Sequence, residues 1–413
     1  FEKKKISNFK SNFGNLKAIN NAFQSCYLDN PKTLEYFDRL KSSEAADYSR
    51  YLFFYVNYLI NKKRFDLVKE ISFEIDELSS NLIILQTKSW IDKSNFNKIK
   101  EIFSCKNEND LLAEFFYLVS NLYSSQDEYE QSNFYLNITY FLNKKFKINL
   151  SLMADNYYLN ENYDQSLNVL KSFDSKDDLY YWFKIKQEAK IITEKKNKEE
   201  ALKYIEKNFK NIKNPSTKVL FDLATIYKNS KKYDKAIELY TSVMSIIEKD
   251  TVNYADLLYR RGGSFERIGK YEKSDKDLLE ALKIIPNNSY VLNYLAYSWL
   301  ERDQNINKAI SMLEKAYKEN ENDPYIIDSV GWGYFLVGKY NDAEKYMRRA
   351  LELMPNDPIV NDHYGDILWK LNRKIQAQYF WNSVLKMEDV EKEMIEKIKV
   401  KLITGLSKNN ENL

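Results

Sequence analysis

A small side chain recurs along most of this chain at a nearly constant interval. Between residues 132 and 377 the steps are 34, 35, 35, 38, 35, 34 and 34 residues. The residue twelve positions before each of these small residues is also small in all but one case. The residue four positions after each of them is bulky. A fixed period of this length is the signature of a repeat protein. The eight positions are Ser132, Ser166, Ala201, Ala236, Ser274, Ala309, Ala343 and Ala377.

The pattern has a direct physical reading as pairs of helices. Two helices approach closely only where small side chains meet, and a bulky residue four positions further lies on the same helical face and fills the adjoining space. In the unit 324–357 these roles fall to Gly331, Ala343 and Met347. One such pair cannot bury its apolar face alone, whereas stacked pairs bury it together. The spacing therefore predicts stacked antiparallel helix pairs.

Composition agrees with an all-helical chain. Only 9 Gly and 6 Pro occur among 413 residues, which is too few for the many turns of an all-β protein. Hydrophobic residues make up 44% of the chain, enough for a continuous core. The best apolar run, 51–60, ends at Asn61 and falls well short of the roughly 20 residues that a membrane-spanning helix needs. We expect no transmembrane segment.

The unit 324–357 resembles the tetratricopeptide repeat in its period and its signature residues. The resemblance implies an all-α, right-handed superhelical solenoid of stacked antiparallel helix pairs that binds other proteins. It is strongest from Thr217 to Met387. The residues that carry it in this unit are Gly331, Tyr334, Gly338-Lys339-Tyr340, Ala343, Ala350 and Pro355.

Repeat quality divides the chain into four predicted regions. Residues 1–112 are degenerate helical repeats, 113–254 are repeats of intermediate regularity, 255–387 match well, and 388–413 form a charged closing helix and a tail. In the first region, Phe65 with Val68 and Phe96 with Ile99 keep the phase of the later repeats. Residues 1–48 are expected to form one more helical unit with a turn at 29–31.

Residue types that carry chemistry are scarce. His363 is the one histidine, flanked by Asp362 and Asp366 on one helical face, so a multi-histidine metal site is excluded. A His/Asp metal site is conceivable there, but a polar protein-binding patch is the favoured interpretation. The segment 261–264 lacks the strand and the Gly-Lys-Ser/Thr ending of a phosphate loop. We expect no catalytic residue, no metal and no cofactor.

Charge and cysteine content constrain partners and compartment only weakly. The chain has 63 Lys+Arg against 60 Asp+Glu, and a net charge of +3 gives no general attraction to nucleic acid or to a membrane surface. We expect protein partners and no nucleic acid. Cys26 and Cys105 lack a metal-binding or redox spacing. Two buried thiols are the favoured interpretation, and a single bridge is the alternative.

The first helices of successive units line the concave side of such arrays, so their inward positions predict a partner-binding groove. It mixes aromatic residues with charges of both signs, a composition favoured at protein-binding hot spots. The aromatic residues Trp332, Phe335 and Trp369 could line the groove or belong to the core between repeats, and the sequence favours neither alternative. The predicted groove residues are Tyr259, Arg260, Tyr294, Ser298, Arg302, Asp328, Trp332, Asp362, His363, Asp366 and Trp369.

Two comparisons within the family restrict the class of partner protein that we expect. Co-chaperone tetratricopeptide domains grip a terminal carboxylate with Lys and Asn four residues apart, whereas the matching positions here include Asp328 and Asp366. The stretches 291–299, 327–332 and 360–366 resemble a bacterial envelope subfamily. Its members are usually exported, and some are outer-membrane lipoproteins that deliver substrates to a carboxyl-terminal processing protease.

Three functional hypotheses follow. The first is a non-catalytic scaffold or adaptor in the bacterial periplasm or at the outer membrane, and the second is a cytoplasmic assembly or regulatory adaptor. The third is the repeat region of an enzyme whose catalytic part lies outside this chain. An export signal or a lipid anchor would lie on a segment that precedes Phe1, and the nature of that segment distinguishes the three hypotheses.

Overall fold

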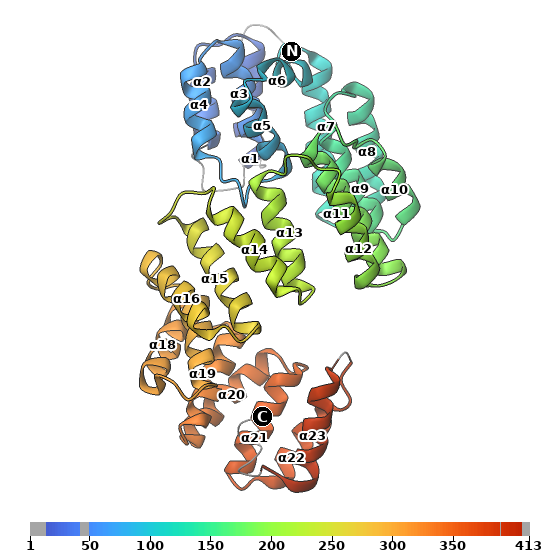
Figure 1. Cartoon of the computed structure of the whole chain (residues 1–413). Coiled ribbons are helices and arrows are strands. Elements are labelled where there is room, and N and C mark those ends of the chain that lie inside the picture. The colour runs from blue at the N-terminus through green and yellow to red at the C-terminus, as the bar shows by residue number, and fades with distance from the viewer. Residues whose placement is uncertain (1–13, 42–48, 389, 407–413) are drawn as a thin grey trace. The chain divides into compact units, whose positions relative to one another are not determined.

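The computed structural model describes residues 14–41, 49–388 and 390–406. Within these ranges there are 23 helices and no strand (Figure 1), so the all-helical prediction is confirmed. In chain order the helices are α1 (Gly14–Tyr27), α2 (Thr33–Lys41), α3 (Tyr51–Asn61), α4 (Phe65–Glu74), α5 (Leu82–Asp92), α6 (Phe96–Ile102), α7 (Glu108–Ser124), α8 (Tyr129–Leu142), α9 (Asn149–Leu159), α10 (Tyr163–Leu170), α11 (Asp178–Lys195), α12 (Lys198–Phe209), α13 (Thr217–Asn229), α14 (Tyr233–Met244), α15 (Val252–Arg267), α16 (Tyr271–Ile284), α17 (Ser289–Leu300), α18 (Ile306–Glu319), α19 (Pro324–Leu336), α20 (Tyr340–Leu353), α21 (Pro358–Lys370), α22 (Lys374–Val384) and α23 (Lys392–Thr404).

Contacts divide the chain into two units, unit 1 (residues 1–223) and unit 2 (residues 224–413), with the boundary inside α13. In unit 1 the pairs α1–α2, α3–α4, α5–α6, α7–α8, α9–α10 and α11–α12 pack together. In unit 2 the pairs α15–α16, α17–α18, α19–α20 and α21–α22 do the same, and α23 packs on α22. The predicted pairing of consecutive helices is therefore confirmed. The four regions drawn from repeat quality stay a prediction. Of residues 1–48, the structure describes 14–41, which form the pair α1–α2 and the turn between them, whereas 1–13 and 42–48 fall outside the described residues.

The eight small positions lie at the helix crossings. All eight are buried, with at most 5% of their surface exposed. The Oγ of Ser166 donates a hydrogen bond to the carbonyl oxygen of Ala154, across the crossing of α9 and α10, at 2.9 Å. A Cβ added to Gly331 would lie 3.1 Å from the Cε of Met347 and 3.3 Å from the carbonyl oxygen of Ala343. The crossing of α19 and α20 thus needs small residues on both helices, as the spacing indicates.

One turn geometry recurs between the helices of the pairs. Gly338 has φ +78°, and the residue that follows it donates its N–H to the carbonyl of Tyr334 at 2.9 Å. Lys63 and Ser94 adopt the same left-handed conformation at the equivalent place in α3–α4 and α5–α6. This is the Schellman type of helix ending. The early pairs therefore keep the turn of the later ones although their small residues are lost.

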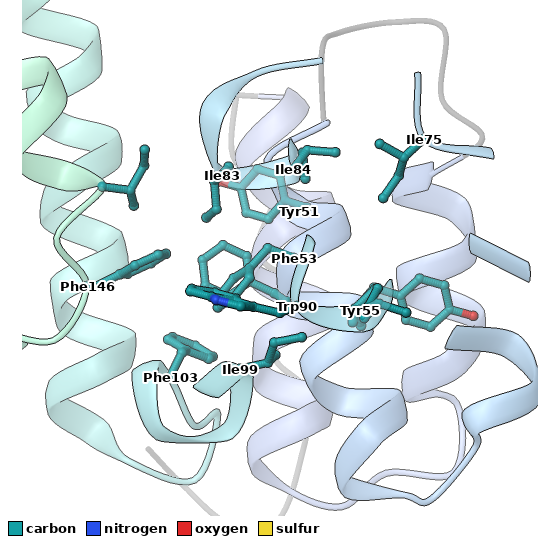
Figure 2. Close-up of a cluster of buried hydrophobic side chains, with 14 of the residues drawn as sticks. Tyr51, Phe53, Tyr55, Ile75, Ile83, Ile84, Trp90, Ile99, Phe103 and Phe146 are labelled. Carbon is teal, nitrogen blue, oxygen red and sulfur yellow. The ribbon is translucent and has the colours of Figure 1, made fainter. Parts of the chain in front are cut away.

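Large apolar side chains fill the core of unit 1 around α3. Eight of the eleven residues of α3 are buried. Phe54 packs against Phe103 with ring centres 4.6 Å apart, and Phe53 packs against Phe146 at 5.3 Å (Figure 2). The aromatic residues of 51–58 thus belong largely to the core between repeats.

The two cysteines form a disulfide, so the expectation of two buried thiols was wrong. Cys26 lies in the last turn of α1 and Cys105 lies between α6 and α7, with their Cα atoms 6.0 Å apart, within the usual range for a bridge. The same two segments meet through Tyr27, whose hydroxyl donates to Glu108 at 2.7 Å, and through Phe23 and Phe103, whose rings are 5.8 Å apart. The cysteines are 79 residues apart in sequence, and packing of α1 on the α6–α7 connection brings them together.

Candidate functional site

A groove of about 1010 Å³ lies in unit 2 between the first helices α17, α19 and α21 on one side and α23 on the other. Helices α19 and α21 begin alike, since Asp323 and Asp357 each cap the helix and a proline follows at its first position. Both helices contribute side chains to the groove lining. Five of the predicted groove residues line it, namely Arg302, Trp332, Asp362, His363 and Asp366.

A stack of rings forms one part of the groove lining. The indole of Trp332 lies parallel to the imidazole of His363, with centres 4.0 Å apart and planes 14° apart. The Nε1 of Trp332 donates a hydrogen bond to Glu301 at 2.7 Å. The ring of Phe335 also stacks on Trp332, with ring centres 4.6 Å apart. Trp332 is half-buried, whereas Phe335 is buried with 7% of its surface exposed. Of these two aromatic residues, Trp332 faces the groove and Phe335 belongs mostly to the core.

His363 is held by an acidic partner from the preceding first helix. Its Nδ1 lies 2.9 Å from an oxygen of Asp328. Burial alone lowers the pKa of His363, but the carboxylate of Asp328, helped by Asp362 and Asp366, outweighs it and raises the pKa above its ordinary value. When the ring is protonated, it pairs with Asp328, and its charge lies against the face of Trp332.

Lys401 of α23 occupies the acidic end of the groove. Its Nζ lies 2.6 Å from Asp362 and 2.8 Å from Asp366, and Asp366 also accepts from the indole N–H of Trp381 at 3.0 Å. Burial tends to lower the pKa of Lys401, but the two carboxylates raise it overall. Burial and the neighbouring Asp362 raise the pKa of Asp366 to about 7, while Lys401 opposes that shift. Helix α23 is thus anchored by an ion pair with only slight access to water.

Asp328 and Asp366, both predicted as groove residues, are buried. They are 7% and 4% exposed, because His363 and Lys401 cover them. Trp369, also assigned to the groove, packs on Trp381 at 5.3 Å beside α23 and is absent from the groove lining.

The remaining four predicted groove residues lie on α15 and α17 and do not line this groove. Arg260 pairs with Asp256 at 2.7 Å. Tyr259 contacts Tyr294 edge to face at 5.7 Å, and the hydroxyl of Tyr294 donates to Glu266 at 3.0 Å. The fourth residue, Ser298, is buried.

Comparison with known proteins decides the family. A family model described as tetratricopeptide repeat matches residues 183–390, which is just over half of the chain. The chain belongs to the tetratricopeptide-repeat family. The resemblance seen in the sequence is therefore confirmed at the level of the family.

Individual tetratricopeptide-repeat relatives match over shorter stretches. The TPR repeat-containing protein PA4667 of Pseudomonas aeruginosa is 37% identical over 111 residues, 27% of this chain and 19% of that protein. The chain thus spans about a fifth of that relative's length. Among solved structures, the protein TTC0263 of Thermus thermophilus is similar at 16% identity, 46% coverage of this chain, 100% coverage of that chain and a TM-score of 0.41. PilF of Pseudomonas aeruginosa is similar at 17% identity, 48% and 85% coverage, and a TM-score of 0.38.

Binding is the chemistry that this tetratricopeptide-repeat groove supports. Its aromatic and aliphatic side chains lie among carboxylates, and an apolar centre with a polar rim is the usual composition of a surface that holds a protein segment. Among the described residues no group of three or more His, Cys, Asp or Glu is arranged to hold a metal ion. No helix in the described ranges is both long and apolar enough to cross a bilayer.

Sequence reasoning did not identify the contribution of α23. The region 388–413 was predicted only as a charged closing helix and a tail, whereas Lys401 is buried and Met394 and Val400 line the groove. A signal exists in the sequence, because Met394, Ile398 and Lys401 recur at helical spacing and put an apolar stripe and one lysine on the same face.

Proposed function

We propose that the chain is a non-catalytic protein-binding adaptor of the bacterial cell envelope, and that unit 2 binds the partner in its groove. The observation that carries the proposal is the groove of about 1010 Å³ with Trp332 and Leu336 on its lining. Aromatic residues in a partly desolvated pocket, surrounded by polar groups, are the usual centres of binding energy in protein interfaces.

The disulfide supports a place outside the cytoplasm. Bridges such as Cys26–Cys105 persist in the periplasm and at cell surfaces, and they are rare in the reducing cytosol. The resemblance of 291–299, 327–332 and 360–366 to exported envelope proteins agrees with this location. We therefore favour a periplasmic or outer-membrane-associated adaptor over a cytoplasmic one, and a periplasmic protease supplied with substrates is one partner of the proposed kind.

Partner capture with a matched pair of variants tests the binding role. Trp332→Ala removes a groove residue, whereas Tyr379→Ala removes an aromatic ring of α22 that is 69% exposed and lies outside the groove lining. We expect the partner recovered from the native cells to be lost with Trp332→Ala and kept with Tyr379→Ala. Equal recovery with both variants, each folded by circular dichroism, would show that the groove is not the binding surface.

Thiol trapping tests the location separately. Native cells are quenched with acid and alkylated, and the state of Cys26 and Cys105 is measured by mass spectrometry. A bridge before cell lysis is expected for an exported protein. Two alkylated thiols would favour the cytoplasmic alternative.

A further inference from the structure

The groove of unit 2 is acidic. Seven carboxylates and three Lys or Arg side chains line it. This local excess of negative charge contrasts with the whole chain, which carries a net charge of +3. A groove that gathers one sign of charge attracts a segment of the opposite sign.

The three cations of the lining are each engaged by a carboxylate of the same chain. Lys401 is buried between Asp362 and Asp366. Arg302 pairs at 2.8 Å with Asp275, which lies outside the lining. Lys397 lies 3.7 Å from Glu393, one helical turn away. Lys401 and Arg302 are thus held in largely buried ion pairs and are not open to an acidic partner, whereas the pair of Lys397 with Glu393 is solvent-exposed.

Acidic side chains stand on both walls of the groove. Glu301 and Asp303 follow the end of α17 on one wall and are exposed. Glu393 and Glu396 project from α23 on the other wall, with 82% and 71% of their side chains exposed. Their ion pairs with lysines of α23 are solvent-exposed, and such pairs contribute little and exchange readily. A cationic segment in the groove would meet carboxylates on either side.

Apolar side chains lie between these acidic walls. Trp332 and Leu336, one turn apart on α19, face Met394 and Val400 of α23 across the groove. Leu336 and Val400 keep 36% and 46% of their surface exposed. Methionine adapts its shape to different apolar partners. The surface therefore suits a segment that is apolar on one face and basic at its edges.

We propose that the occupant of the groove is a basic, amphipathic segment of the partner protein. The chain itself illustrates the chemistry, since α23 inserts Lys401 between Asp362 and Asp366 while its Met394 and Val400 face the groove. The proposal rests on the proposed protein-binding function and names the class of partner for the same site. A partner that presents an acidic tail would find carboxylates instead of the positive charge it requires.

Designed peptides test the charge preference directly. A labelled amphipathic peptide of about 18 leucine and lysine residues forms five helical turns, and its counterpart carries glutamate in place of every lysine. Fluorescence anisotropy with the full chain should show the lysine peptide binding at least about tenfold more tightly, with the preference shrinking at about 0.5 M salt. Equal affinities, or tighter binding of the glutamate peptide, would overturn the proposal.

A matched pair of charge reversals separates the groove from general attraction. The double variant Glu393→Lys/Glu396→Lys changes the groove wall. The double variant Glu280→Lys/Glu352→Lys makes the same change in net charge on α16 and α20. As in the groove variant, each of these glutamates forms an exposed ion pair with a basic residue of its own helix, here three positions away. We expect the groove variant to raise the Kd of the lysine peptide about tenfold and the control variant to raise it less than about twofold. Equal weakening by both would show attraction to overall charge and would overturn the proposal.

The neutral variant Glu393→Gln/Glu396→Gln guards against a folding defect and should give an intermediate Kd. Failure of this proposal is distinct from failure of the proposed function. If partner capture depends on Trp332 but the captured segment carries more Asp and Glu than Lys and Arg, the partner class is wrong and the binding role stands. If capture does not depend on Trp332, the groove itself is wrong.

Discussion

The first pairs of unit 1 and the pairs of unit 2 have the same architecture but pack side chains of different size at their crossings. In unit 2 a small residue lies at each crossing, as Gly331 does against Ala343. In the first pairs of unit 1 the phase is kept by larger residues, and Val68 and Ile99 are fully buried among aromatic rings. The left-handed turn residue is nevertheless shared, at Lys63 in unit 1 and at Gly338 in unit 2. The comparison teaches that the turn and the helix phase preserve the repeat, while the side chains at the crossing are free to change size together.

The units also differ in what covers their apolar surfaces. In unit 1 the outer face of α7–α8 leaves Phe115, Phe134 and Phe141 with 53%, 62% and 77% of their surface exposed. In unit 2 the apolar residues of the groove lie between α23 and the first helices, among carboxylates. Unit 1 is fastened by a disulfide, and unit 2 is closed by the buried pair of Lys401 and Asp366. The first unit thus carries the covalent constraint and the second the candidate binding surface.

The largest loss of stability is expected at a crossing of unit 1 where a large residue stands in place of a small one. Ile99→Ala in unit 1 should lower the free energy of unfolding by about 2–5 kcal/mol, because the cavity left among fixed neighbours is not refilled. Urea unfolding followed by circular dichroism measures the loss, and Lys100→Ala on the same helix is the control. A change below about 1 kcal/mol would mean that the early pairs repack freely, which is atypical for a core of this density.

Removal of the disulfide should weaken unit 1 alone. The double variant Cys26→Ser/Cys105→Ser opens a loop of 79 residues, and bridges of this kind typically stabilise by about 2–4 kcal/mol. Hydrogen exchange measured by mass spectrometry should show faster exchange in peptides of unit 1, with peptides of α17–α22 unchanged. Equal acceleration in both units would contradict their separation.

The opposite substitution should be costly in unit 2. Ala343→Leu forces a larger side chain against α19, and overpacking of this kind costs about 1–3 kcal/mol. Lys345→Leu, on the exposed side of α20, is the matched control and should leave the thermal melt nearly unchanged. A melt of Ala343→Leu that matches the control would show that the crossing tolerates size as readily as in unit 1.

The smallest effect is a pH dependence confined to unit 2. The pKa of His363 is raised in the folded state, so its contribution to stability is present below its unfolded pKa of about 6.5 and is lost as pH rises through the folded value. Asp366, with a pKa raised to about 7, acts in the same direction between its unfolded value and about pH 7. The charged groups around His363 are Asp328 of α19, Asp362 and Asp366 of α21, and Lys401 of α23.

Urea unfolding at a series of pH values from about 6 to 8 should therefore show unit 2 becoming less stable as pH rises. The variant His363→Gln should flatten part of this slope without affecting unit 1. A wild-type stability that increases over this interval would contradict the assigned ion pair of His363 with Asp328.

Periodic features could be predicted from the sequence, and contacts made by single side chains could not. The spacing of small residues located every crossing from Ser132 to Ala377, because helix packing imposes that period on the sequence. The disulfide escaped prediction, since the two cysteines meet only through tertiary packing over 79 residues. The burial of Lys401 was not predicted either, because a lysine on a charged closing helix is expected to be solvated. Its burial depends on the carboxylates of Asp362 and Asp366, whose positions are known only from the structure.

The most direct test of the central claim is site-specific photo-cross-linking in the native cells. A photoreactive amino acid is placed at Leu336 in the groove of unit 2, at Phe134 on the exposed face of unit 1, or at Ile375, which is 85% exposed on α22 outside the groove lining. If unit 2 binds the partner in its groove, a cross-linked partner should appear with Leu336 and be absent with Phe134 and Ile375. A partner that cross-links to Phe134 and not to Leu336 would contradict the account and move the binding surface to unit 1.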